Sequence, residues 1–224
     1  GTTGWAMSAS GMAAVWAGEN TREAILAAMK RREVYATSGP RIAVQFFAGW
    51  EFSEGQVQAA DLYQSATAAG VPMGGGISGS DGRAPAFIVR AMKDPAGANL
   101  DRIQIVKGWV DAAGESHEKV YDVAWSAGRQ RDLDGRLPPV GNTVEAATAR
   151  YANTIGAPEL ATLWQDPDFD PAVPAFYYAR VLQIPTPRHS LYDAVALGLS
   201  SAEGQPDTVQ ERAYTSPIWY QPTD

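Results

Sequence analysis

Three aspartates alternate in the segment DPDFD, at Asp166, Asp168 and Asp170. Calcium loops use this pattern because a hard cation takes several oxygen ligands. The sixth position is Pro171, where such a loop has glycine, and the twelfth is Tyr177, where it has a bidentate acid. The segment is therefore interpreted first as a stiff, solvated acidic loop, with a calcium site as the alternative.

The two histidines, His117 and His189, are the other candidate metal ligands. Asp122 follows His117 by five residues, but residues five apart on a strand face opposite sides. His117 is therefore interpreted as a surface residue beside a hairpin turn. His189 precedes a helical segment, where it is either a ligand, a general base or a helix-entry residue. A complete metalloenzyme would combine both histidines with the three aspartates.

The segment ATSGPR contains groups that suit an anion. Ser38, Gly39 and Arg41 would present a hydroxyl, a backbone N–H and a guanidinium. The competing interpretation is a turn at the end of a strand, followed by an exposed arginine. Four tryptophans lie on expected strands, at Trp50, Trp109, Trp125 and Trp219. An aromatic face can stack sugars, although burial in a core or an interface is the default for tryptophan.

The elements that position these groups follow from periodicity and capping signals. Asn20 and Glu23 form a capping box that predicts a helix over residues 21–32. A second short helix is predicted over residues 158–165, where proline occupies the first position, and residues 61–70 suit either a short helix or an irregular edge. Strands are predicted at 12–16, 34–37, 41–50, 86–95, within 100–128 around a turn at 111–116, and at 144–151, 175–184 and 213–220.

These elements predict a mainly β, α+β protein. A short helix–strand unit occupies residues 1–40, and an antiparallel β-sandwich follows over residues 41–224. The net charge of −7 disfavours a nucleic-acid partner, because phosphate neutralisation needs a basic surface. The absence of cysteine excludes disulfides and thiolate metal sites. The sequence contains no run of about 18 apolar residues, so no membrane-spanning helix is predicted.

Several stretches carry a family resemblance over nearly the whole chain, from about Val15 to Tyr220. They are VWAGENTREAILAAMKRREVYATSGPRI, KDPAGANLDRIQIVKGWVD, HEKVYDVAWS, DPDFDPAVPAFYYARVLQIPTPR and ERAYTSPIWY. Together they resemble the C-terminal part of the bacterial domain-of-unknown-function family 3604. That family is similar to the PHP metallohydrolases, and to the CehA/McbA type in which a helix and a YATSG segment close a β/α barrel before a β-sandwich.

The resemblance implies that the chain is the C-terminal portion of a metal-dependent hydrolase acting on phosphoester-type bonds. Zinc or manganese would then be bound by the remainder of the same polypeptide, and no cofactor is expected in this chain. The family's His-x-His and Asp-x-His motifs do not occur here, so no catalytic ligand can be transferred and the chain alone is expected to be inactive. Ser38, Gly39 and Arg41 would lie at the rim of the parent's site.

Two matters stay open at this stage. One alternative is a stand-alone β-sandwich module that binds a carbohydrate or a protein through an aromatic patch. Localisation is the other, because any targeting segment would lie upstream of Gly1. A periplasmic or extracytoplasmic location is one option for a bacterial protein of this kind.

Overall fold

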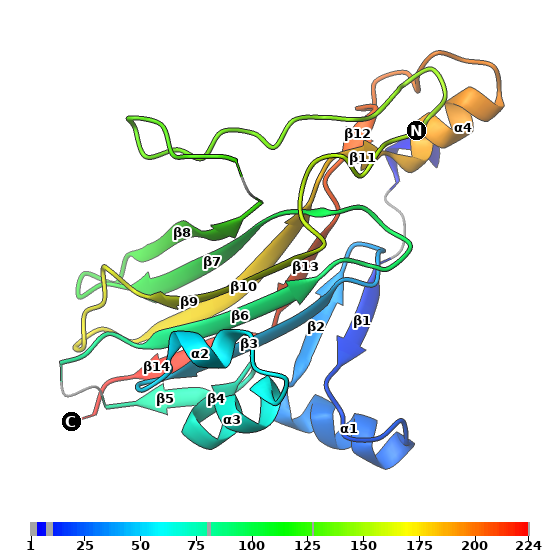
Figure 1. The fold of residues 1–224 in the computed structure, drawn as a ribbon. Coiled ribbons are helices and arrows are strands. Elements are labelled where there is room, and N and C mark those ends of the chain that lie inside the picture. Colours follow the sequence, from blue (N-terminus) through cyan, green and yellow to red (C-terminus); the bar gives the residue numbers. More distant parts are fainter. Residues whose placement is uncertain (1–3, 8–10, 80–81, 127, 224) are drawn as a thin grey trace.

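The computed structural model describes residues 4–7, 11–79, 82–126 and 128–223, and its strands form two packed sheets (Figure 1). The large sheet has the order β1-β2-β13-β10-β14-β5, and β7 and β8 extend it from the other edge of β10. Every pair in it is antiparallel except β14 with β5. The small sheet has the antiparallel order β4-β3-β6-β9.

The bounds of the elements are as follows. The helices are a 3₁₀ turn at Gly4–Ala6, α1 Arg22–Arg31, α2 Glu54–Val57, α3 Leu62–Ala69 and α4 His189–Ala196. The strands of the large sheet are β1 Met12–Val15, β2 Val34–Thr37, β5 Gly76–Ser78, β7 Leu100–Val110, β8 Ser116–Trp125, β10 Ala175–Gln183, β13 Arg212–Thr215 and β14 Ile218–Gln221. The small sheet contains β3 Ala43–Gly49, β4 Gly70–Pro72, β6 Ala86–Met92 and β9 Glu159–Gln165, and a separate ribbon pairs β11 Thr186–Pro187 with β12 Thr208–Val209.

The core lies between the two sheets. Alternate residues of β3 and β6 meet alternate residues of β7 and β10, as the two-residue period of a strand requires. Phe46 and Phe87 stack with their ring centroids 5.7 Å apart, and Phe87 lies 4.5 Å from the ring of Tyr177 on the opposite sheet. Each such fully buried side chain contributes roughly 1.5–3 kcal/mol. The predicted antiparallel sandwich is therefore confirmed, and the described strands form no closed barrel.

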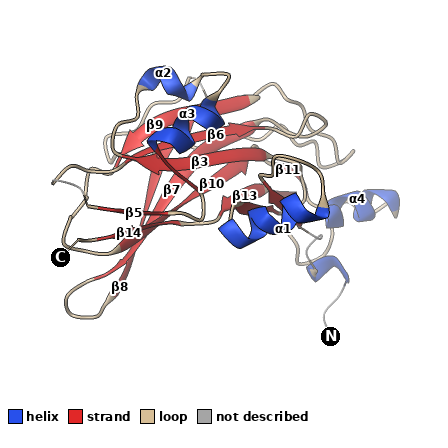
Figure 2. Cartoon of the chain, turned by 90° about the horizontal axis from the view of Figure 1, so that it is seen from below, coloured by secondary structure: helices blue, strands red, loops and turns tan. Residues whose placement is uncertain are grey.

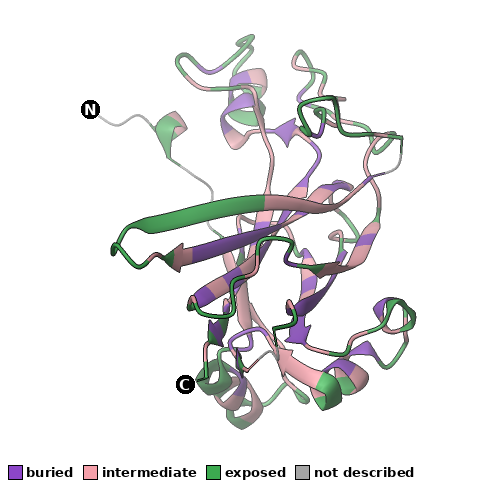
Figure 3. Ribbon diagram, turned by 90° about the vertical axis from the view of Figure 1, so that its left-hand side faces the viewer, coloured by how far each residue is buried: buried purple, intermediate pink, exposed green. Residues whose placement is uncertain are grey.

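The two outer faces of the sandwich differ. Helices α2 and α3 cover the small sheet, where Phe47 and Ile88 pack against Val57, Leu62 and Ala66 (Figure 2). Among the described residues no helix packs in the same way on β7, β8, β10 and β14 of the large sheet. The hairpin of β7 and β8 extends beyond the body, and the first half of β8 is exposed (Figure 3). This end of the large sheet is therefore accessible to a ligand.

The predicted helix–strand unit forms, with one change at its start. Helix α1 and strand β2 lie where the pattern places them, but the N-cap is Thr21 and not Asn20. The Thr21 hydroxyl accepts from the Ala24 backbone N–H at 3.2 Å. Strand β2 pairs with β13, so residues 12–37 belong to the same sheet as the sandwich. That residues 1–40 end a barrel in a longer polypeptide stays a prediction, and residues 1–3 and 8–10 lie outside the described part.

Three other predictions about elements are wrong. Residues 159–165 form strand β9, because its alternating side chains pair with β6 along seven residues. Residues 144–151 form turns with a single bridge between Glu145 and Arg150 instead of a strand. The expected strand over residues 213–220 is divided into β13 and β14, because Pro217 lacks the N–H that a continuous ladder needs.

Candidate functional site

The acidic loop between β9 and β10 is held by an ion pair inside the sandwich. Lys107 of β7 donates to Asp166 Oδ2 at 2.6 Å and to the Asp168 carbonyl at 2.8 Å. The Tyr177 hydroxyl donates to the same Asp166 oxygen at 2.7 Å. Both charged side chains are almost wholly buried. A buried carboxylate is stable only with such partners, and here they are a lysine and a tyrosine.

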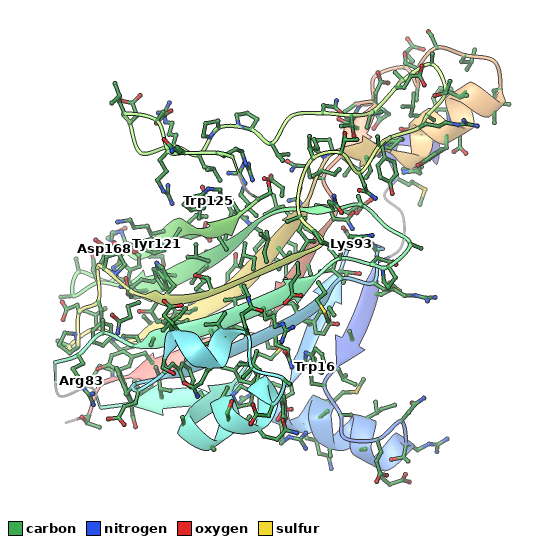
Figure 4. The ribbon with its side chains drawn as sticks, in the orientation of Figure 1. Trp16, Arg83, Lys93, Tyr121, Trp125 and Asp168 are labelled. Carbon is green, nitrogen blue, oxygen red and sulfur yellow. The ribbon has the colours of Figure 1, made fainter. Side chains whose placement is uncertain are left out.

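The same loop makes a second ion pair at the surface. Lys119 and the Tyr121 hydroxyl donate to Asp168 Oδ2 at 2.6 and 2.7 Å (Figure 4). These two donors lower the pKa of Asp168, while burial and the bond to Asp168 raise the pKa of Tyr121. Asp170 instead accepts from the Ala172 backbone N–H at 2.9 Å. The carboxylates of the three aspartates thus already accept hydrogen bonds from lysines, tyrosines and backbone N–H groups of their own loop.

The two histidines lie at opposite ends of the molecule. His117 is on the β7–β8 hairpin, where its ring stacks on Trp109 at 5.2 Å and its Nε2 lies 2.7 Å from Asp111 Oδ2. This contact, with the backbone N–H groups of Glu115 and Ala113, lowers the pKa of Asp111. His189 begins α4, which Figure 1 shows away from that hairpin.

The candidate ligand set therefore does not assemble. Among the residues that the structure describes, no group of three or more histidine, aspartate or glutamate side chains is placed to hold a metal ion. The arrangement found here does not fit a metal centre built from His117, His189 and the three aspartates.

The ATSGPR segment has carboxylates beside its donors. The Ser38 hydroxyl donates to the Glu211 carboxylate and accepts from the Arg212 backbone N–H at 2.9 Å. The backbone N–H of Arg41, and not its guanidinium, donates to Asp94 Oδ2 at 2.8 Å, and this bond is the main cause of the lowered pKa of Asp94. The Gly39 N–H donates to Thr37 Oγ1 at 3.3 Å. An anion would have to displace these partners, so the role of this segment at a substrate rim stays a prediction.

Three of the four candidate tryptophans are engaged by other side chains. Trp50 packs edge-on against Phe169 and Tyr220, with centroids 6.4 and 6.3 Å apart. The Lys107 ammonium lies 5.3 Å from the Trp109 ring. The Arg131 guanidinium lies 5.2 Å from the Trp125 ring. Only Trp219 of the four lies with its ring in the exposed aromatic row that follows.

The outer face of the large sheet carries an aromatic row along β10. Its register pairs Phe176 with Trp219, and the two ring centroids are 5.5 Å apart. Tyr178 follows at 6.5 Å from Phe176, and Tyr214 at 6.3 Å from Tyr178. Since the intervening Tyr177 is in the core, strand alternation places these rings on the opposite, outer face.

A glycine forms the base of this row. Phe176 is paired with Gly108 on β7, and a Cβ atom at residue 108 would lie 2.3 Å from the phenyl ring. No side chain fits there, so the ring lies directly on the strand backbone. Glycine inside a strand commonly marks such a close approach.

A groove of about 560 Å³ lies where the aromatic row meets the hairpin. Trp219 is 40% exposed and Val110 is 54% exposed, which is high for side chains of this kind. Polar groups accompany the apolar ones. The groove is lined by Gly108, Trp109, Val110, Ser116, His117 and Glu118 from the hairpin, by Pro174, Ala175 and Phe176, and by Trp219 and Gln221 from β14.

The groove combines flat apolar rings with hydrogen-bonding groups at their edges. Ligand sites typically have this composition, with a few polar groups that fix orientation. Lysine and arginine are absent from the described residues that line it, and Glu118 is its acidic group. The arrangement suits an uncharged ligand with an apolar face and many hydroxyls. The sequence signal for the row is the alternation of Phe176, Tyr178 and Arg180 against Tyr177 and Ala179. By itself this alternation predicts a strand and not which of its faces is exposed.

The fold and the groove define the class of protein: a mainly antiparallel β-sandwich with an aromatic groove on its uncovered sheet. The particular family is given by the sequence, which matches the family described as "Protein of unknown function (DUF3604)" over residues 1–222. The chain therefore belongs to the DUF3604 family. No curated protein and no solved structure matches the chain. None of the described helices is both long and apolar enough to cross a membrane.

Proposed function

We propose that this chain is a β-sandwich module that binds a carbohydrate in the groove between the β7–β8 hairpin and β14. The observation that carries the proposal is the pair of the exposed Trp219 and the half-buried Phe176, whose ring centroids are 5.5 Å apart, with Phe176 lying on Gly108. The two rings are tilted by 53°, and the exposed face of Trp219 suits the C–H face of a sugar. Glu118 and Gln221 lie beside them to bond its hydroxyls.

The charge of the groove favours this ligand over an ionic one. An anion would need a free cationic side chain. The described lining includes neither lysine nor arginine, and His117 is already paired with Asp111, its Nε2 lying 2.7 Å from Asp111 Oδ2. A protein partner would need a larger apolar surface, since specific interfaces bury about 800 Å² on each side. A single sugar chain needs only the rings and the polar groups already present.

A glycan array with the purified chain tests the proposal. Binding to one class of glycan that is lost in Trp219→Ala and kept in Tyr192→Ala is the expected result. Tyr192 on α4 is the matched control because it is an aromatic residue of similar exposure, 48% against 40% for Trp219. A wild-type chain that binds no glycan, or the same glycans with and without Trp219, would remove the proposal.

We also propose that the module belongs to a longer, metal-dependent hydrolase acting on phosphoester-type bonds. The support is the resemblance itself, which assigns the helix–strand unit of α1 and β2 to the end of a barrel in a longer polypeptide; in this chain β2 pairs with β13 of the sandwich. Metal chemistry would come from the remainder of the polypeptide, because within the described residues His117 and His189 do not gather with Asp166, Asp168 and Asp170 into a ligand set.

The hydrolase proposal has its own test. Phosphoesterase turnover with Zn²⁺ or Mn²⁺ is expected in the longer polypeptide and not in this chain. Robust turnover by this chain alone would contradict it, and so would an inactive longer polypeptide with metal bound. Neither result depends on glycan binding.

A further inference from the structure

A second cavity lies on the other side of the molecule, between the β1–α1 connection and helix α3. Its volume is about 220 Å³, and it is lined by Trp16, Gly18, Gln45, Tyr63 and Gln64. Figure 4 shows Trp16 where the chain leaves β1. The lining residues come from three separate segments, so the cavity is a product of the tertiary fold.

The two aromatic walls are held in place. The Trp16 indole N–H donates to the Val44 carbonyl at 2.7 Å. The Tyr63 ring packs edge-on against Phe47 with centroids 5.9 Å apart, and its hydroxyl donates to Glu33 at 2.8 Å. Rings fixed in this way lose little side-chain entropy when a ligand packs against them.

The inner end of the cavity is mostly apolar and has no uncompensated charge. A smaller void of about 10 Å³ shares Trp16, Gln45 and Tyr63 with the cavity and reaches Glu33. That volume is close to the space that one water molecule needs. The Glu33 carboxylate is 5% exposed and is paired with Arg31 at 2.7 Å. An ionic ligand would find no uncompensated charge here.

Two carboxamides supply the hydrogen-bonding capacity. Gln45 is half-buried on β3, between the fully buried Val44 and Phe46, and Gln64 is exposed on α3. In the described part of the chain, neither side-chain amide makes a hydrogen bond. Because Gln45 is only half-buried and lines the cavity, a ligand there can reach its amide. Each amide offers adjacent donors and an acceptor to a ligand.

We propose that this cavity binds one uncharged ring compound, which packs against Trp16 or Tyr63 and is hydrogen-bonded at its edge by Gln45 and Gln64. The cavity volume suits a single sugar ring or a nucleobase. Both carry adjacent donors and acceptors, so free monosaccharides and nucleosides share the required chemistry. This site is separate from the groove and does not depend on the function proposed for it.

Saturation-transfer NMR on the purified chain tests the site with four probes: glucose, galactose, adenosine and uridine. Saturation transfer to at least one probe is expected. Whether the sugars or the nucleosides respond shows whether the ligand is a monosaccharide or a nucleobase. Gln45→Leu keeps the volume but removes the amide, and should weaken binding about tenfold through the loss of one or two hydrogen bonds. Gln64→Ala, at an exposed position, is the second variant in case Gln45→Leu does not fold.

Trp219→Ala is the control, because it alters the groove and not this cavity. Binding that is unchanged in Trp219→Ala and weakened in either glutamine variant supports the site. The proposal is overturned if the wild-type chain shows no transfer to any of the four probes. It is equally overturned if a folded glutamine variant binds as the wild type does, or if only Trp219→Ala abolishes binding.

Discussion

The ring of Phe176 lies against the backbone of Gly108, so close that a Cβ atom at residue 108 would be 2.3 Å from it. The two residues are paired across β10 and β7, and the same register pairs Phe176 with Trp219 on the other side. One glycine therefore sets the depth of the aromatic groove. The proposed carbohydrate site depends on this contact.

Gly108→Ala should destabilise the protein by about 1–3 kcal/mol, because the new methyl group forces the Phe176 ring away from the sheet. Urea unfolding measures the change. Gly76→Ala is the matched control, since its Cβ would lie 3.6 Å from the Trp219 carbonyl, an ordinary contact. A Gly108→Ala variant as stable as Gly76→Ala would contradict the packing described here.

The buried pair of Lys107 and Asp166 gives a second prediction. Lys107→Met should cost about 3–5 kcal/mol, because it leaves the Asp166 carboxylate buried without its cation. The double variant Lys107→Met/Asp166→Leu should recover most of that loss, since replacement of a buried ion pair by apolar groups is often neutral. Chemical denaturation of the three proteins measures both effects.

Its control is Lys119→Met, which removes a lysine from the half-exposed pair with Asp168. Surface pairs of this kind contribute about 0–1 kcal/mol. If Lys107→Met and Lys119→Met lowered the free energy of unfolding equally, the Lys107–Asp166 pair would not be shielded from water as the structure indicates.

The surface ion pair of Lys119 and Asp168 predicts that the stability of the protein depends on pH. Lys119 and Tyr121 lower the pKa of Asp168 in the folded protein. This stabilisation is present above the unfolded aspartate pKa of about 3.9 and is lost as the pH falls through the lower folded value. The stability gap between wild type and Asp168→Asn should therefore be largest above about pH 4 and should close below it. A gap that stays constant in urea titrations from pH 6 to pH 2.5 would refute this origin.

The start of α1 gives a prediction that separates two neighbouring residues. Thr21→Ala should cost about 1 kcal/mol, because its hydroxyl caps the Ala24 N–H. Asn20→Ala should change stability by less than about 0.5 kcal/mol, the usual range for a surface substitution. Thermal unfolding of both variants would show the reverse order if Asn20 were the cap.

The main elements could be predicted from local patterns. Helix α1, strand β2 and the 111–116 turn follow from apolar periodicity, basic residues in the last helical turn and turn chemistry. The sequence predicts a helix where β9 forms, because Pro158 is typical of the first position of a helix and ELATLWQ has no strong β signal. The conformation of β9 is determined by its pairing with β6. The two strands are distant in sequence: Arg90 on β6 and Glu159 on β9, which form an ion pair, are 69 residues apart.

The candidate sites could be predicted less well, because they depend on contacts between distant segments. Nothing near Asp166 in the sequence indicates that Lys107 neutralises it, 59 residues away. The aromatic row was present in FYYAR as an alternation, but its exposure depends on which sheet face the helices leave uncovered. Gly108 was unremarkable in sequence, and only the register of β7 with β10 shows its role.

The most direct test of the proposed function is calorimetric titration of the best glycan from the array into three proteins: wild type, Trp219→Ala and Tyr192→Ala. Stacking on the exposed Trp219 predicts that affinity falls at least about tenfold in Trp219→Ala and stays at the wild-type value in Tyr192→Ala. Equal affinities for all three proteins would show that the groove is not the carbohydrate site.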